Sequence, residues 1–97
     1  MPPPNPGAIS ARAVTADAAE LAWRLDEPRT ALALAEQALE GDPYRESIWR
    51  LLMRIAGSLG QYDEVVHHYR RCGLALEEVS ASPTSATRRL LTELRHA

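Results

Sequence analysis

The sequence predicts an all-α fold in which helical hairpins stack side by side. Three observations predict it. Apolar residues recur with the spacing of helices, and no segment alternates between apolar and polar residues over a useful length. Residues 48–59 have eight apolar side chains in twelve positions, so this helix needs neighbours on more than one side. The chain also repeats its own pattern in its second half.

The N-terminal half is expected to contain a tail and two helices. Residues 1–8 are rich in proline and typical of a flexible tail or linker, and residues 9–97 are expected to form one helical domain. The first helix is predicted over residues 10–25. Asp26 is the N-cap candidate of a second helix that has Pro28 in its first turn and reaches about residue 40.

The C-terminal half is expected to contain three more helices. Asp42 is the N-cap candidate of a third helix over residues 43–59, which a glycine ends. A fourth helix is predicted over residues 62–79, where Gly73 is expected to permit a close approach of a neighbouring helix. A Ser-Pro pair then opens a fifth helix over residues 83–96, whose one apolar side suits it to cover the end of the array.

The internal repetition predicts two copies of one helical hairpin. When the sequence is aligned with itself at a constant offset, the turn at Asp26 falls on the turn at Gly60, and Thr15 falls on Trp49. A helix–turn–helix unit with this period, about 34 residues, is typical of tetratricopeptide repeats. The predicted architecture is therefore two tetratricopeptide-like hairpins plus a C-terminal capping helix, a fragment of an α-solenoid. Trp49 and Tyr69 are expected to lie buried between the two hairpins.

Composition indicates an ordinary cytoplasmic protein of one domain. The chain has 97 residues, of which 45% are hydrophobic, and no apolar run approaches the ~18 residues of a membrane span. A single cysteine permits no internal disulfide, which favours the cytoplasm. All 11 basic residues are arginine and alanine is abundant, which favours a bacterial source with GC-rich DNA. A pI near 5.9 argues against this chain clamping DNA by itself.

A candidate groove for a partner lies along the first helix of each predicted hairpin, by analogy with tetratricopeptide arrays. Arg50 and Arg54 lie one turn apart on the polar stripe of the third helix, and both are expected to be exposed. They would pair with the carboxylates of an acidic peptide, against the flat ring of Trp23. Alternatively, the two arginines only solvate an apolar helix and bond to acids such as Glu20. The complete candidate groove consists of Glu20, Trp23, Arg24, Ser47, Arg50 and Arg54.

The first helix also has an apolar side that its own hairpin does not need. Val14, Leu21 and Leu25 share this side. Two repeat units are fewer than the three or so that such arrays usually require. We therefore expect these three residues to dock on a further domain or on a second copy of the chain, as in a homodimer.

No catalytic, cofactor or metal site is predicted. His68 and Cys72 have the spacing of two ligands on one metal, but Cys72 falls on the core face and no further ligands are evident. No phosphate-binding loop or paired nucleophile and base occurs, so we expect no enzyme activity. The arginine pairs at 70–71 and 88–89 could contact DNA phosphate or an acidic polymerase surface, although solvated helix faces explain them equally well.

Residues 29–95 go beyond a generic repeat. The segments "DPYRESIWRLLMR" and "LGQYDEVVHHYRRC", and Pro83 followed by Thr87 and Arg88, resemble the bacterial transcriptional activator domain of the antibiotic regulatory protein family of actinomycete activators. Two segments depart from that family's pattern. "SAS" replaces a Gly-Val-Glu lead into the proline, and "VVHHY" replaces an alanine-rich turn.

The resemblance implies a function that spacing and composition do not show. In that family the domain follows a winged-helix DNA-binding domain, supports dimerisation and helps to engage RNA polymerase. The implied partners are a second copy or RNA polymerase subunits, with DNA reached only through a domain absent here. The alternatives are a free-standing peptide-binding scaffold and an arm of a signalling ATPase. A winged-helix segment encoded before Met1 would favour the activator, and a nucleotide-binding domain after residue 97 would favour the ATPase.

Overall fold

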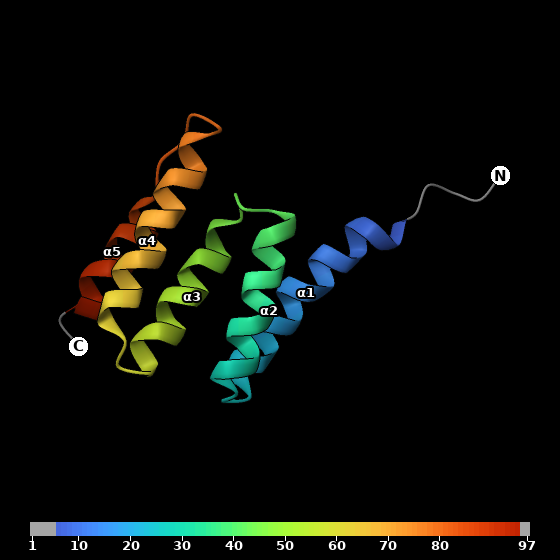
Figure 1. Ribbon diagram of the computed structural model, residues 1–97, viewed down its shortest axis with the longest axis horizontal. Coiled ribbons are helices and arrows are strands. Elements are labelled where there is room, and N and C mark those ends of the chain that lie inside the picture. Colours follow the sequence, from blue (N-terminus) through green and yellow to red (C-terminus); the bar gives the residue numbers. More distant parts are fainter. Residues whose placement is uncertain (1–5, 96–97) are drawn as a thin grey trace.

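The computed structural model describes residues 6–95, with side chains from Val14 onward, and this range contains five helices. Figure 1 shows α1 to α4 following one another across the array, with α5 lying against α4. No strand occurs between residues 6 and 95, so the predicted all-α fold of two hairpins and a closing helix is confirmed. The helices are α1 (Pro6–Arg24), α2 (Pro28–Gly41), α3 (Glu46–Ser58), α4 (Tyr62–Glu77) and α5 (Ser85–Arg95).

The first helix begins earlier than the sequence predicts. α1 starts at Pro6 rather than at residue 10, because proline is well tolerated in the first turn, where its missing N–H has no helical partner. Residues 6–8, which we expected in the tail, therefore belong to a helix. Residues 1–5 of the expected tail lie outside the described residues.

The two aspartates predicted as N-caps do not cap helices. Asp26 lies in the left-handed region with φ of +58°, and the residue that precedes α2 makes no side-chain capping bond. Asp42 instead accepts a hydrogen bond at Oδ1 from the Tyr44 amide (3.1 Å), which makes a short turn. The Pro43 carbonyl accepts a hydrogen bond from Trp49 Nε1 (2.7 Å). These two bonds hold the chain out of the helix, so α3 begins at Glu46 and not at residue 43.

The predicted Ser-Pro start of the last helix is also displaced. α5 begins at Ser85, and the amides of Thr87 and Arg88 both donate to the Thr84 carbonyl (3.1 Å each). Thr84 thus occupies the capping position that the sequence pattern assigned to the serine before Pro83.

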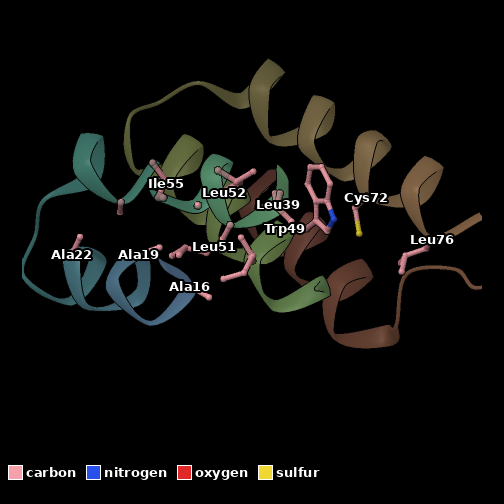
Figure 2. Close-up of a cluster of buried hydrophobic side chains, with 14 residues drawn as sticks. Ala16, Ala19, Ala22, Leu39, Trp49, Leu51, Leu52, Ile55, Cys72 and Leu76 are labelled. Atoms are coloured by element: carbon pink, nitrogen blue, oxygen red, sulfur yellow. The ribbon is translucent and has the colours of Figure 1, made fainter. Parts of the chain in front are cut away.

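The core is built around α3, which is buried around almost its whole circumference. One cluster joins α3 to the alanine-rich surfaces of α1 and α2, and Figure 2 shows Trp49 within it, beside Leu39 and Cys72. A second cluster joins Met53 of α3 to Val65 of α4 and to α5. Contacts on both sides explain why this segment is so apolar. The buried residues of α3 are Ile48, Trp49, Leu51, Leu52, Met53, Ile55 and Ala56.

Several positions that correspond in the two repeats are buried in the same way. At most of these positions the first hairpin has alanine where the second hairpin has a larger side chain, so its two helices meet through small residues. Thr15, however, is only half-buried where its counterpart Trp49 is 3% exposed. The pairs in which both members are buried include Ala19 with Met53, Ala22 with Ala56, Ala31 with Val65 and Ala38 with Cys72.

Two predictions about α4 are wrong. Tyr69 does not lie between the hairpins; it is half-buried and packs with Met53, Val65 and Leu90, on the side of the array that α5 covers. Gly73 does not permit a close helix approach, because a Cβ built there would meet nothing within 4 Å. The close approach occurs at Gly57 of α3, where a Cβ would lie 3.0 Å from Leu94 Cδ2 of α5.

Candidate functional site

The polar stripe of α3, which we expected to face solvent, is partly covered by α5. Arg50 Nη1 donates to Thr87 Oγ1 (3.1 Å) and lies 3.6 Å from Glu46 Oε2. Thr87 is completely buried, and the Arg50 side chain keeps only 24% of its exposure. The prediction that both groove arginines are exposed is therefore wrong for Arg50. The acid beside it is Glu46 of its own helix, not Glu20 of α1.

The Glu46 carboxylate fixes the start of α5. Its Oε2 accepts hydrogen bonds from the Thr84 amide (2.8 Å), the Thr84 hydroxyl (2.7 Å) and the Thr87 hydroxyl. Burial raises the pKa of Glu46, but the bonds from both threonines and the charge of Arg50 lower it by more, so the pKa lies below its ordinary value. The ionised carboxylate thus caps α5 from another helix. We call Glu46, Arg50, Thr84 and Thr87 the α5 latch.

The other predicted groove residues are distributed over two helices. Trp23 is half-buried and packs against the larger core cluster, so part of its ring is used for folding. Arg54 is exposed, and within residues 14–95 it has no ion pair. Arg54 is therefore exposed, as the groove hypothesis requires, whereas Arg50 is largely covered. Of the remaining members, Arg24 is exposed, and Glu20 and Ser47 are half-buried.

The apolar side of α1 is exposed. Val14, Leu21 and Leu25 keep 63%, 55% and 62% of their exposure. Val14 and Leu21 are seven positions apart and share one face of α1. Leu25 directly follows the last residue of the helix, and its amide donates to the Leu21 carbonyl (2.9 Å). The buried residues of α1 are instead its alanines, which belong to the cluster shared with α2 and α3.

A groove runs between the second helices of the two hairpins. One half of it is a cleft of about 340 Å³ that lies between α2, α3 and α4. A second cleft of about 540 Å³ is also lined by Leu32 and Gln61, so the two clefts adjoin each other. We call the pair the α2–α4 groove. It is lined by Arg29, Leu32, Glu36, Ile55, Ala56, Leu59, Gln61, Glu64 and His68.

His68 forms a buried polar part of the wall of this groove. Its side chain is 6% exposed, and Nε2 lies 3.9 Å from Glu64 Oε2. Nδ1 has no hydrogen-bond partner among the described residues. Burial is the largest influence on His68 and lowers its pKa, so the imidazole is neutral at pH 7.

A salt bridge closes the far end of the groove. Arg71 of α4 donates from Nη1 and Nη2 to the two carboxylate oxygens of Glu36 on α2 (3.0 and 3.2 Å). The same guanidinium lies over the Trp49 ring, with Cζ 4.9 Å from the ring centre. Arg71 therefore ties the two hairpins together above a core tryptophan, which holds the groove at a fixed width.

Cys72 behaves as a core residue. It is completely buried, and burial is the main reason that its pKa is raised to about 11. Its thiol is thus protonated at neutral pH and a poor nucleophile or ligand. Between residues 14 and 95, no group of three or more His, Cys, Asp or Glu side chains could hold a metal ion.

Sequence reasoning missed both the α5 latch and the α2–α4 groove. It treated His68 only as a possible metal ligand and did not consider Glu46 or Thr87 as partners. The spacing of Glu64 and His68, which puts both on one side of α4, was the available signal for the groove. For the latch, the helix-starting "SPTSAT" segment contains the two threonines, but nothing in it indicates a carboxylate from another helix.

The fold and these surfaces define a small array of helical hairpins. A comparison with models of protein families identifies the family to which the chain belongs. The family model described as bacterial transcriptional activator domain matches residues 9–95, and the chain belongs to this family. No curated protein and no solved structure matches the chain. None of the described helices is both long enough and apolar enough to cross a membrane.

Proposed function

We propose that this chain is the protein–protein interaction and dimerisation module of a cytoplasmic transcriptional activator of the actinomycete type. It supports a DNA-binding domain outside this chain and contacts the transcription machinery. Membership of the activator-domain family supports the role in transcription. The observation that carries the interaction role is the exposed apolar surface formed by Val14 and Leu21 of α1 and by Leu25, which follows the helix.

A second copy of the chain is the proposed occupant of this face. Helical-repeat arrays need polar outer faces at their ends to remain soluble, and α1 is the terminal helix of the array in Figure 1. Two α1 helices related by a twofold axis would bury the same apolar side chains on each other. Dimerisation would then place two DNA-binding domains side by side.

Sedimentation equilibrium tests the dimer. We expect the wild-type chain to dimerise and the double variant Leu21→Glu with Leu25→Glu to be monomeric, because four carboxylates would meet in the interface. Leu74→Glu is the matched control, since Leu74 is equally exposed (64%) but lies on α4. A wild-type chain that stays monomeric at about 1 mM, the concentration range of the weakest specific contacts, would refute the dimer.

The contact with transcription machinery is proposed to involve two exposed arginines, Arg24 of α1 and Arg54 of α3. Arg54 and Arg24 present exposed guanidinium groups that suit an acidic partner segment. The test fuses residues 9–95 to an unrelated DNA-binding domain and measures transcription from a reporter promoter. Arg54→Glu should lower transcription, and Arg70→Glu on the exposed surface of α4 should not. Equal losses in the two variants would refute this assignment.

A further inference from the structure

One half of the α2–α4 groove is the cleft of about 340 Å³ between α2, α3 and α4, which we call the His68 cleft. Its apolar part consists of Leu32 of α2 and of Ile55 and Ala56 of α3, both of which are buried. Its volume lies within the range of pockets that bind small ligands or single side chains. The polar residues that line the cleft are Glu36, Gln61, Glu64 and His68.

Two acceptors in the His68 cleft lie at a distance that one donor group can bridge. Glu64 Oε2 and His68 Nε2 are 3.9 Å apart, which is too long for a hydrogen bond between them. A nitrogen atom between them can lie about 2.9 Å from each, the usual length of an N–H hydrogen bond. The Glu64 side chain is 52% exposed, and within residues 14–95 it makes no ion pair other than this long contact with a neutral ring.

The His68 ring is incompletely hydrogen-bonded. Its side chain is 6% exposed, and Nδ1 has no partner in the described part of the chain. Buried polar atoms are nearly always hydrogen-bonded in folded proteins. A neutral imidazole that has its proton on Nδ1 accepts a hydrogen bond at Nε2. A buried imidazole with an unpaired nitrogen in the wall of a cleft therefore points to a ligand that donates to the ring.

The charges around the cleft favour a cation as this ligand. Glu36 is already bonded to both nitrogens of Arg71, so this pair contributes no net charge. Figure 1 shows α2 and α4 beginning at the same edge of the array, where acidic residues outnumber arginines. Arg29 is also at this edge, but it lines only the adjoining cleft. The acids at this edge are Asp26, Glu27, Asp63 and Glu64, and the arginines are Arg24 and Arg29.

We propose that the His68 cleft binds the side chain of a lysine in a partner protein, with the ammonium donating to Glu64 Oε2 and His68 Nε2. The alkyl stem of the lysine packs on the apolar part of the cleft. An ammonium has three rotatable donors on one compact charge, so it serves two acceptors at once. The proposal rests on the proposed function in that the partner is a protein of the transcription machinery. It places that partner on α2 and α4, away from the exposed residues of α1.

The adjoining cleft favours a lysine within a polypeptide over a free amine. The two clefts share Leu32 and Gln61, and the second is also lined by Leu59, which is 38% exposed. A residue next to the lysine in the partner covers this leucine and adds apolar contact. A free alkylamine fills only the His68 cleft, so it lacks that contribution.

The probe is the peptide acetyl-Leu-Lys-Leu-amide, titrated into the ¹⁵N-labelled chain at pH 7 and followed by NMR. We expect the amide signals of Leu32, Gln61 and His68 to shift most, because these residues line the cleft. Acetyl-Leu-norleucine-Leu-amide keeps the alkyl stem but lacks the ammonium, and it should bind roughly fivefold more weakly. Pentylamine is the small-molecule arm, and it should also bind more weakly than the lysine peptide.

A neutral substitution at Glu64 tests the first acceptor. Glu64→Gln removes the charge but keeps the shape, so the lysine peptide should bind roughly fivefold more weakly. The affinity for the norleucine peptide should not change. The matched control is Asp63→Asn, which removes the same charge in the first turn of α4 but outside the cleft. Both residues are exposed, so both variants should melt like the wild type.

The titration of His68 tests the second acceptor. Burial is the largest influence and lowers the pKa of His68, whereas Glu36 and Glu64 raise it and Arg71 and His67 lower it. An ammonium bound at Nε2 disfavours the protonated ring, so the lysine peptide should lower the pKa of His68 further. The norleucine peptide should not. The ring signal of His67, which is exposed and lies outside the cleft, is the internal control.

The outcomes separate this proposal from the proposed function. Preference for the lysine peptide that Glu64→Gln removes and Asp63→Asn keeps, together with a lowered pKa of His68, would support the lysine site. Equal binding of the norleucine peptide or of pentylamine, an unchanged pKa of His68, or no shift at about 5 mM peptide would each overturn it. Dimerisation through α1 and activation through Arg54 are measured with other variants, so either can fail while the lysine site stands.

Discussion

The two sides of α3 are joined to the rest of the molecule in different ways. On one side, Trp49 and Leu52 belong to a buried apolar cluster that also contains the alanines of α1 and α2 and Cys72 of α4. On the other side, α5 is attached by the α5 latch and by Leu94 against Gly57, with only Leu90 of α5 buried in the apolar cluster. The first junction depends on shape, and the second depends on individual donors and acceptors.

This difference has a consequence for stability. An apolar junction loses stability in proportion to the volume removed from it, whatever the pH. A junction that depends on an ionised carboxylate loses stability when that carboxylate is neutralised or its donors are removed. We therefore expect substitutions in the first junction to have the largest effects, and those in the second to be smaller but sensitive to pH.

The largest effect is expected for Trp49→Ala. This change removes a side chain that is 3% exposed, leaves the Pro43 carbonyl without its donor and removes the ring under Arg71. The free energy of unfolding should fall by about 3–5 kcal/mol. Denaturant titration followed by circular dichroism measures it.

Trp23→Ala is the matched control for this substitution. Trp23 is the other tryptophan of the chain, and it is half-buried at the edge of the same cluster. Its removal should lower the free energy of unfolding by roughly 1–2 kcal/mol. Losses of the same size at both positions would contradict the view that the apolar junction is centred on α3.

The second effect concerns the two arginines of α3. Arg50→Glu places a second carboxylate beside Glu46 and removes the donor to Thr87, so the free energy of unfolding should fall by about 2–3 kcal/mol. Arg54→Glu should change it by no more than about 0.5 kcal/mol, because Arg54 is exposed. Thermal melting of both variants makes the comparison. If Arg50→Glu melts like the wild type, α5 is not latched as described.

The expectation that Arg50 and Arg54 are both exposed shows which features a sequence pattern can predict and which it cannot. Helical periodicity predicted the five helices and the burial around α3, because both depend on which side of a helix is apolar. It could not show that the polar stripe with Arg50 and Gly57 faces α5. The position of α5 depends on contacts between residues that are distant in the sequence. A polar stripe that faces the polar start of another helix has the same sequence pattern as a polar stripe that faces water.

The errors at the helix starts have a more local cause. Asp42 and Pro43 have the composition of a helix N-terminus, but the Trp49 indole, in the first turn of the next helix, binds the Pro43 carbonyl and keeps these residues in a turn. The α2–α4 groove was unpredictable for another reason. It arises because α2 and α4 both pack on α3 and are bridged to each other at Arg71 and Glu36, and this spacing is a property of the assembled hairpins.

The third effect is the pH dependence of the α5 latch. The folded-state pKa of Glu46 lies below its ordinary value of 4.5, so the ionised carboxylate stabilises the fold fully above about pH 4.5. That contribution is lost as the pH falls through the lower, folded-state pKa. Glu46→Gln should therefore cost about 1–2 kcal/mol at pH 7 and progressively less below pH 4.5.

Comparing the wild type with Glu46→Gln isolates this contribution. All other ionisable groups are present in both proteins, so their contributions cancel in the difference between the two unfolding free energies. Hydrogen exchange provides a second measurement, because the first amides of α5 should lose protection in the variant while those of α2 keep it. A difference in stability that does not change between pH 7 and pH 3 would argue against an ionised Glu46 in the latch.

The smallest effect compares two glycines in helices. Gly73→Ala should raise the free energy of unfolding by about 0.5–1 kcal/mol, because alanine favours the helix and its Cβ would meet nothing within 4 Å. At Gly57 the same gain is opposed, since the new Cβ would lie 3.0 Å from Leu94 Cδ2 and α5 would have to yield. The gain from Gly57→Ala should thus be the smaller of the two, measured by denaturant titration.

A double substitution identifies the source of that difference. Leu94→Ala removes the atom that the Gly57 Cβ would meet, so Gly57→Ala made in this background should recover the gain seen at Gly73. The coupling free energy between residues 57 and 94 then measures the apolar contact between α5 and α3 separately from the latch. If Gly57→Ala gives the full gain without Leu94→Ala, α5 is free to move away, and its attachment depends on Glu46 and the two threonines.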